Sequence, residues 1–200
     1  MEFVALSDAV LRTLALEDPE LRRVFHGVHP ADQLPRSPAM SVRQAYIVNT
    51  DPAGEPGQHW LGLWTEKNQC EIFDSYGLPL HVYTNPELHQ WWGQWKYLTR
   101  SDQTLQALDS QTCGHYALFF LKARAQGRSY QEFLSQWSCD NLVLNDQKVA
   151  EQLKRVIKRE LQDEVDARPE GGQKNVSRQA FITCNHCECC LLYTSDAADE

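Results

Sequence analysis

The first 25 residues alternate apolar and charged positions at helical spacing. The recurring apolar side chains are Phe3, Leu6, Val10, Leu14 and Leu21. This spacing predicts one or two short amphipathic helices near Pro19. The next stretch, HGVHPADQLPRSP, contains three prolines and loses the period. We therefore expect a loop there.

Four short segments further along the chain are rich in β-branched and aromatic residues, with turn-forming residues between them. The segments are AYIVNT (45–50), HWLGLWTE (59–66), QCEIFDSYG (69–77) and KYLTR (96–100). Such residues are enriched in strands, whereas Gly, Pro, Asn and Asp mark turns. The pattern predicts a small central sheet.

From Gly114 onward the spacing of apolar residues becomes helical. Three segments show it: GHYALFFLKARAQG (114–127), SYQEFLSQW (129–137) and NDQKVAEQLKRVIKRELQDEVD (145–166). Gly127 suits a helix C-terminus, and Ser129 suits an N-cap. Helices before and after a block of strands predict the α+β class, with a small mixed or antiparallel sheet flanked by helices.

The length of 200 residues and the 42% hydrophobic content favour one domain, which we expect over residues 1–168. Residues 169–189 are expected to form a flexible, cysteine-rich tail. The last eleven residues, CLLYTSDAADE, resemble the in-frame translation of a transposase adapter used in preparing DNA libraries. We therefore expect residues 190–200 to be non-native.

The net charge of −8 gives no general attraction for nucleic acid or for an anionic membrane surface. Basic residues in QKVAEQLKRVIKREL alternate with acidic ones, which predicts a solvated helix face. No run of 18 apolar residues occurs, and the N-terminus lacks the pattern of a secretory signal. We expect an intracellular, non-secreted protein whose partners are neither nucleic acid nor a membrane.

Four of the seven cysteines crowd into CNHCECC (184–190), and the other three are scattered. This odd and sparse set indicates free thiols rather than disulfides. CNHCECC contains zinc-ligand residue types but lacks a second, well-separated ligand pair, so we expect no metal site.

Cys113 stands directly before a helical apolar run, in the segment DSQTCGHYALFF (109–120). Its side chain is therefore expected at a helix N-terminus, where unpaired N–H groups and the helix dipole favour a thiolate. The ordinary alternative is a small buried core residue. A nucleophilic cysteine needs a base, a carboxylate that orients the base, and donors for the oxyanion.

Three upstream residues can supply these groups. His59 begins one predicted strand and Asp74 closes the next, so antiparallel pairing brings imidazole and carboxylate together. Gln106, seven residues before Cys113, can point its amide beside the backbone N–H of that cysteine. Taken singly, each has an ordinary alternative: an exposed strand-end histidine, a turn-forming aspartate and a loop glutamine. The order His, Asp, Gln, Cys favours a catalytic site.

The motifs GQHW, FDSYG and Q-x6-CG, in this order, resemble the adenain-type cysteine proteases of adenoviruses and of Maverick or Polinton transposons. The segments GVHPADQLP and AYIVNTDP extend the resemblance, which spans roughly residues 20–140. The roles that it implies are nucleophile for Cys113, general base and acid for His59, orienting acid for Asp74, oxyanion donor for Gln106, and substrate contact for Trp60.

Adenain depends on cofactors that this sequence supports only in part. An activating peptide joins adenain through a cysteine shortly before the catalytic glutamine, whereas YLTRSDQTL (97–105) contains no cysteine. The resemblance thus implies an activating peptide, but not a disulfide-linked one at that place. Adenain also uses DNA through a strongly basic surface, and DNA is not expected as a cofactor of this acidic chain.

The resemblance implies a cysteine endopeptidase that cuts structural precursor proteins of a virus or transposon at small, glycine-containing sites. We expect it to be a monomer. The host nucleus or a viral particle is then the expected location. Two alternatives stay open. Proteases of ubiquitin-like modifiers share the catalytic order and fold, although they commonly place the glutamine six residues before the cysteine. A decayed copy that acts as a binding module is the non-enzymatic alternative.

Overall fold

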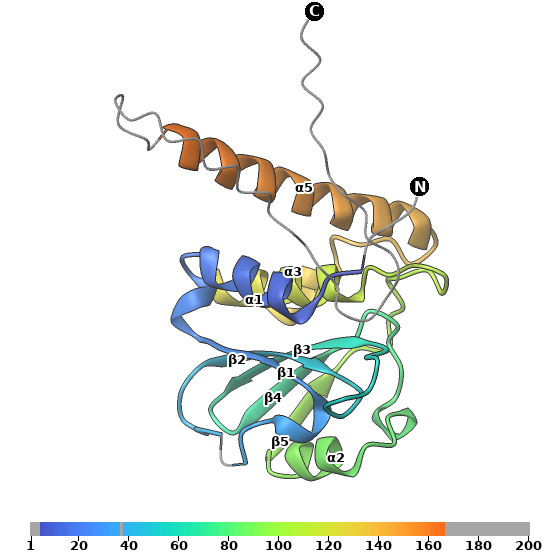
Figure 1. Cartoon of the computed structure of the whole chain (residues 1–200). Coiled ribbons are helices and arrows are strands. Elements are labelled where there is room, and N and C mark those ends of the chain that lie inside the picture. Colours follow the sequence, from blue (N-terminus) through green and yellow to red (C-terminus); the bar gives the residue numbers. More distant parts are fainter. Residues whose placement is uncertain (1–4, 37, 167–200) are drawn as a thin grey trace, which may run out of the picture.

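A five-stranded mixed sheet lies at the centre of the fold (Figure 1). The computed structural model describes residues 5–36 and 38–166. Its strands are β1 (Phe25–His29), β2 (Gln44–Asn49), β3 (Trp60–Glu66), β4 (Gln69–Phe73) and β5 (Tyr97–Arg100). Its α-helices are α1 (Asp8–Glu17), α2 (Pro86–Trp92), α3 (Cys113–Ala125), α4 (Tyr130–Leu134) and α5 (Leu142–Asp166). The predicted α+β class is confirmed, whereas the predicted tail at 169–189 and residues 190–200 lie outside the described residues.

The strands follow one another across the sheet in chain order. β2, β3 and β4 pair antiparallel, and β1 and β5 add to the two edges in parallel. Lys67 and Asn68 form the turn between β3 and β4 with φ angles of 51° and 63°. Two positive φ angles suit a tight hairpin, because that backbone twist matches the twist of the strands. The antiparallel register of this hairpin places the start of β3 opposite the end of β4.

The loop predicted for HGVHPADQLPRSP was wrong in its first part, which forms most of β1. This strand pairs with β2, with an irregularity between Phe25 and Gly27, where φ of Gly27 is 130°. The Arg12 guanidinium of α1 donates to the Val28 carbonyl at 3.1 Å. Pairing with β2 and contact with α1 therefore override a local sequence signal dominated by proline and glycine.

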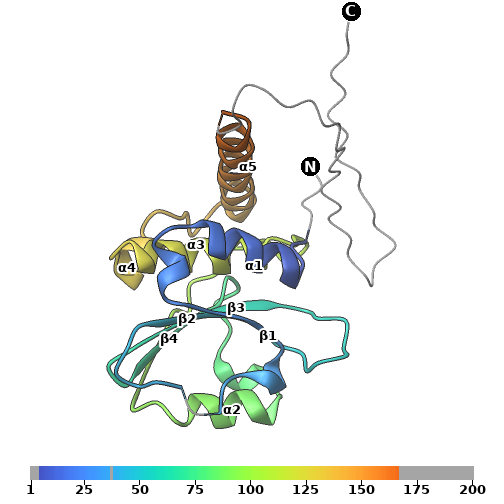
Figure 2. The ribbon, with the colours of Figure 1, turned by 60° about the vertical axis from the view of Figure 1, so that its left-hand side comes forward.

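Helices cover both faces of the sheet. α1 and α3 lie on one face, α2 lies on the other, and α5 lies beyond α3, away from the sheet (Figures 1 and 2). Successive residues of β2, β3 and β4 point alternately into one of two hydrophobic cores, one on each face of the sheet. The core under α1 and α3 takes Ala45, Ile47, Trp64 and Phe73 from the sheet. The core under α2 takes Tyr46, Val48, Leu61 and Leu63, and packs them on Trp91, Trp92 and Trp95.

Two glycines allow α3 to approach the sheet closely. A β-carbon at Gly62, in β3, would lie 3.1 Å from the Phe120 ring and 3.2 Å from the Ala117 carbonyl. At the start of α3, a β-carbon at Gly114 would lie 3.2 Å from the Trp60 indole. Larger residues would push the helix away. The first turn of α3 is therefore held against the beginning of β3.

The predicted caps around α4 are present. Gly127 has a φ of 86° just after α3, and its N–H donates to the Arg124 carbonyl. Ser129 and Glu132 then form a reciprocal capping box at the start of α4.

Within residues 5–36 and 38–166, no helix combines the length and apolar character that crossing a bilayer requires.

Candidate active site

Cys113 is the first residue of α3, as predicted, and its side chain is half-buried. The N–H groups of a first helical turn have no acceptors within the helix, and the positive end of the helix dipole lies there. The Thr112 hydroxyl, directly before the helix, donates to the Asp146 carboxylate at 2.8 Å. The thiol thus occupies a fixed, electropositive and partly accessible position.

His59 and Asp74 meet at the ends of two neighbouring strands. Nε2 of His59 lies 2.7 Å from Oδ1 of Asp74, and the two residues are only 7% and 4% exposed. His59 directly precedes β3 and Asp74 directly follows β4, and these strands pair antiparallel. The predicted meeting of imidazole and carboxylate is therefore observed.

Asp74 is held by three further donors. Its carboxylate accepts hydrogen bonds from the N–H groups of Tyr76 (2.9 Å) and Leu78 (2.8 Å), and from the Tyr83 hydroxyl (2.6 Å). Burial alone would raise the pKa of Asp74, but the His59 interaction and the other hydrogen bonds outweigh burial and lower it. The carboxylate is therefore ionised, and its orientation is fixed.

His59 lies between Asp74, which holds its Nε2, and Cys113, with which it can exchange a proton. Burial alone would lower the pKa of His59, but its interactions with Asp74 and with Cys113 outweigh burial and raise it to about 9. Nε2 is engaged by Asp74, and Nδ1 is buried without a close hydrogen-bond partner among the described residues. Nδ1 is therefore the ring nitrogen available to the thiol.

Two tyrosines, which the sequence reasoning missed, lie nearly parallel to the His59 ring. The Tyr76 ring is stacked at a centroid distance of 4.8 Å, with 27° between the planes. The Tyr83 ring lies at 6.4 Å and 4°. Tyr76 belongs to the FDSYG motif and so had a sequence signal, whereas nothing in the sequence marks Tyr83. Together they fix the plane of the imidazole.

Gln106 lies in the predicted loop, but its amide is already engaged. Nε2 donates to the Ser110 carbonyl at 2.8 Å and to the Tyr76 hydroxyl at 3.2 Å, and Oε1 accepts from the Ser75 hydroxyl at 2.7 Å. The residue is fully buried. Both amide hydrogens thus have acceptors in the structure. The predicted role of Gln106 as oxyanion donor beside the N–H of Cys113 stays a prediction.

The start of α5 anchors the loop that carries Gln106 and leads into α3 at Cys113. Asn145 donates to the Leu105 carbonyl at 3.1 Å. Asp146, which is 1% exposed, accepts from the Ala107 N–H at 3.1 Å as well as from Thr112. The Tyr116 hydroxyl adds a bond of 3.1 Å to Asp146. This anchoring depends on tertiary packing and had no signal in the sequence.

Trp60 follows His59 and is half-buried against the first turn of α3. Its indole N–H donates to the Leu6 carbonyl at 3.2 Å, which ties the segment before α1 to the site. Its ring packs near Gly114, next to Cys113. The predicted substrate contact of Trp60 stays a prediction.

The three cysteines within the described residues are free and differ in environment. Cys113 is half-buried, Cys70 is buried in the core under α2, and Cys139 is exposed. Burial raises the pKa of the Cys70 thiol well above its ordinary value. The described residues contain no group of three or more His, Cys, Asp or Glu side chains arranged to hold a metal. The motif CNHCECC lies outside them.

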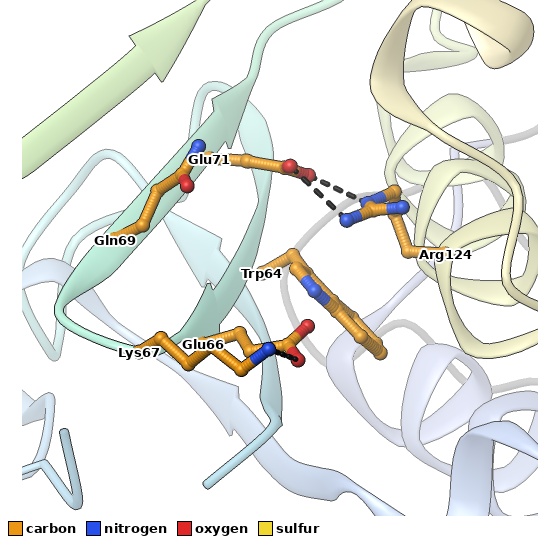
Figure 3. A pocket seen from close by; sticks show the side chains of 6 residues that line it. All are labelled: Trp64, Glu66, Lys67, Gln69, Glu71 and Arg124. Atoms are coloured by element: carbon orange, nitrogen blue, oxygen red, sulfur yellow. Dashed lines mark hydrogen bonds and ion pairs between the residues drawn. The ribbon is translucent and has the colours of Figure 1, made fainter. Parts of the chain in front are cut away.

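A small pocket of about 220 Å³ lies at the far end of the β3–β4 hairpin (Figure 3). It is lined by Trp64, Glu66, Lys67, Gln69, Glu71 and Arg124. The Arg124 guanidinium forms two hydrogen bonds to Glu71, at 2.6 and 3.1 Å, and lies over the Trp64 ring. The length of β3 separates this pocket from His59 by roughly 20 Å. It is therefore separate from the candidate active site.

No protein-family model matches the sequence, and no curated protein matches it. Two crystal structures of the ASFV pS273R protease are similar to it. One has 22% identity and a TM-score of 0.34, over 57% of this chain and 44% of that chain. The other has 16% identity and a TM-score of 0.43, over 73% of this chain and 66% of that chain. These values are too low to transfer an activity or a residue role to this chain, which spans less than two thirds of either structure.

Proposed function

We propose that this protein is a cysteine-type peptidase with Cys113 as nucleophile. The observation that carries the proposal is the position of His59, which bonds the ionised Asp74 at 2.7 Å and interacts with Cys113, so that its pKa is raised to about 9. An imidazolium that persists at neutral pH stabilises a neighbouring thiolate. A helix N-terminus at Cys113 favours the same charge.

The proposed reaction uses these groups in sequence. The Cys113 thiolate attacks the substrate carbonyl carbon, forming the S–C bond, while the carbonyl electron pair moves onto oxygen. The His59 imidazolium then gives its proton to the departing amine as the C–N bond breaks. His59 next takes a proton from water, which attacks the thioester. The S–C bond then breaks, the acid product leaves, and the Cys113 thiolate and the His59 imidazolium are restored.

Asp74 holds His59 throughout this cycle. Its four hydrogen bonds keep the carboxylate where it accepts the Nε2–H of His59. This fixes the tautomer in which Nδ1 is the nitrogen that exchanges a proton with Cys113 or the leaving group. No metal or organic cofactor enters any step.

The proposed substrate class and cleavage site rest on the sequence resemblance to adenain. We propose an endopeptidase that cuts structural precursor proteins of a virus or transposon at small, glycine-containing sites. The preference for small residues is what the resemblance implies, and Trp60, beside the first turn of α3, is the residue that it places in contact with the substrate. The protein partner is thus a substrate. An activating peptide is implied by the resemblance alone, and DNA is tested as an activator rather than assumed.

A cleavage panel tests the proposal. The full chain and its Cys113→Ala variant are incubated with peptides that contain glycine sites and with fusions of ubiquitin-like precursors, each with and without DNA. Cutting of the short peptides by the wild-type protein alone is the expected result. Cutting of folded modifiers alone would place the protein with the modifier proteases. If neither the peptides nor the fusions are cut and the Cys113 thiol has ordinary reactivity, the non-enzymatic binding module is the alternative that remains.

A further inference from the structure

The Tyr76 hydroxyl lies between the two halves of the candidate site. It accepts a hydrogen bond from Nε2 of Gln106 at 3.2 Å, and the ring that carries it is stacked on His59. Burial raises the pKa of Tyr76, and the charge of Cys113 is the next largest contribution. The hydroxyl is therefore protonated at neutral pH, and Cys113 is among the charges close enough to influence it.

Gln106 cannot reach an oxyanion without giving up an existing bond. One of its amide hydrogens is directed at the Ser110 carbonyl and the other at Tyr76, and the side chain is fully buried. A phenol hydroxyl, by contrast, accepts one hydrogen bond and still has its own proton to donate. Tyr76 can therefore keep the bond from Gln106 and donate to a substrate oxygen.

The backbone around Tyr76 is fixed, which argues against a role in which the Tyr76 side chain moves to block substrate access. Its N–H donates to Asp74 at 2.9 Å, and its carbonyl accepts from the Thr104 hydroxyl at 2.9 Å. The next residue, Gly77, has a φ of 66°, and a β-carbon there would lie 2.7 Å from the Asp102 backbone. The backbone is thus held on both sides of Tyr76, and the ring itself is held by stacking on His59.

We propose that the Tyr76 hydroxyl is a catalytic group of this site, donating a hydrogen bond to the oxyanion of the tetrahedral intermediate, while Gln106 orients it. This inference rests on the proposed peptidase function. The Tyr76 O–H bond stays intact: the carbonyl electron pair moves onto oxygen when the S–C bond forms, and returns when the C–N bond breaks. The backbone N–H of Cys113, at the helix start, is the second donor.

Tyr76→Phe tests the proposal, because it keeps the ring that stacks on His59 and removes only the hydroxyl. Loss of one oxyanion donor lowers turnover on the order of 100- to 1,000-fold. We expect that loss in kcat, with KM changed less than about threefold. The affinity for a peptide aldehyde, whose adduct with Cys113 places an oxygen at the same point, should fall on the same order. Tyr97→Phe, on the exposed edge strand β5, is the matched control.

Two further measurements separate the proposal from other roles. The rate of Cys113 alkylation should be unchanged in Tyr76→Phe, because the hydroxyl acts on the intermediate rather than on the resting thiol. Since Gln106 acts through Tyr76, the double variant Tyr76→Phe/Gln106→Ala should lose no more than the more impaired single variant. Multiplicative losses would overturn the orienting role of Gln106.

Wild-type cleavage with a Tyr76→Phe variant of unchanged kcat and aldehyde affinity would overturn this inference and leave the peptidase proposal standing. A higher kcat/KM in that variant would show that the Tyr76 hydroxyl obstructs the substrate, and it would overturn the inference equally. Absence of wild-type cleavage in every arm, with an unreactive Cys113, would instead overturn the peptidase proposal and this inference with it.

Discussion

Nε2 of His59 lies 2.7 Å from Oδ1 of Asp74, in a part of the structure from which solvent is almost excluded. The same carboxylate is bonded by two backbone N–H groups and by the Tyr83 hydroxyl. A buried carboxylate with this many donors does not turn, so it dictates which nitrogen of the imidazole carries a hydrogen toward it. The orientation of His59 toward Cys113 follows from that bond.

Asp74→Asn should leave the protein folded and nearly inactive. An amide in place of the carboxylate favours the wrong imidazole tautomer, and the same exchange in a Ser-His-Asp triad lowers kcat by about 10⁴-fold. The substitution also removes the negative charge that helps to raise the pKa of His59. The basic limb of the pH–rate profile should therefore move below pH 9. Kinetics from pH 5 to 10 check both effects, and an unshifted basic limb would contradict the role of Asp74.

Gln106→Ala should lower kcat by roughly 100- to 1,000-fold and change KM little, whether the amide bonds the oxyanion itself or orients Tyr76. The variant also loses buried bonds to Ser75 and Ser110, so its melting temperature must be measured beside its kinetics. A folded Gln106→Ala variant with kcat near that of the wild type would remove Gln106 from the mechanism.

Arg124→Met should be strongly destabilising, because it leaves Glu71 buried without its partner. The two side chains are only 15% and 11% exposed, and breaking one side of a buried pair costs about 3–5 kcal/mol. Burial already raises the pKa of Glu71 although Arg124 opposes it, so the pair adds little net stability. The double variant Glu71→Met/Arg124→Met should therefore be more stable than the single variant.

Urea denaturation measures these differences. The pair of the exposed Arg43 and the half-buried Glu66 supplies the control, since Arg43→Met should cost no more than about 1 kcal/mol. Equal losses for Arg43→Met and Arg124→Met would contradict the buried character of the Glu71–Arg124 pair.

His115 should make the fold sensitive to acid. It is 5% exposed, and burial lowers its pKa to about 4. The unfolded chain takes up a proton near pH 6.5 and the folded chain does so only near pH 4, so stability is lost as pH falls through this window. The shift corresponds to about 3 kcal/mol. His59 has a raised pKa, so its contribution is complete below pH 6.5 and is lost as pH rises through about 9.

Urea denaturation at pH 6.5 and pH 4 separates the two histidines. His115→Phe should lose less stability than the wild type between these values, whereas His81→Phe, at an exposed position, should keep the wild-type difference. The same pH dependence in His115→Phe and the wild type would contradict this account of His115.

The sequence predicted the site best where chemistry follows directly from an element boundary. Cys113 precedes an apolar helix, and His59 and Asp74 stand at the ends of two consecutive strands, so the hairpin alone brings the last two together. Tyr83 and Asp146 gave no such signal, because their contacts with Asp74 and with Thr112 depend on how distant segments pack. The partners of the Gln106 amide could not be foreseen for the same reason.

β1 shows the same limit in the fold. Its five residues carry a glycine and two histidines, and they form a strand only because β2 and α1 supply partners. The strong strand signals of β2, β3 and β4 needed no such help. Local pattern thus predicted the centre of the sheet and missed one edge.

The alkylation rate of Cys113 at pH 6 tests the central claim, a thiolate paired with the His59 imidazolium, most directly. The full chain is treated briefly with iodoacetamide, and each cysteine is quantified by peptide mass spectrometry. A free thiol is almost fully protonated at this pH, so Cys113 should react at least about 10-fold faster than the exposed Cys139, while the buried Cys70 stays unmodified. In His59→Ala the advantage of Cys113 should vanish. Equal rates for Cys113 and Cys139 in the wild-type protein, unchanged by His59→Ala, would contradict the account.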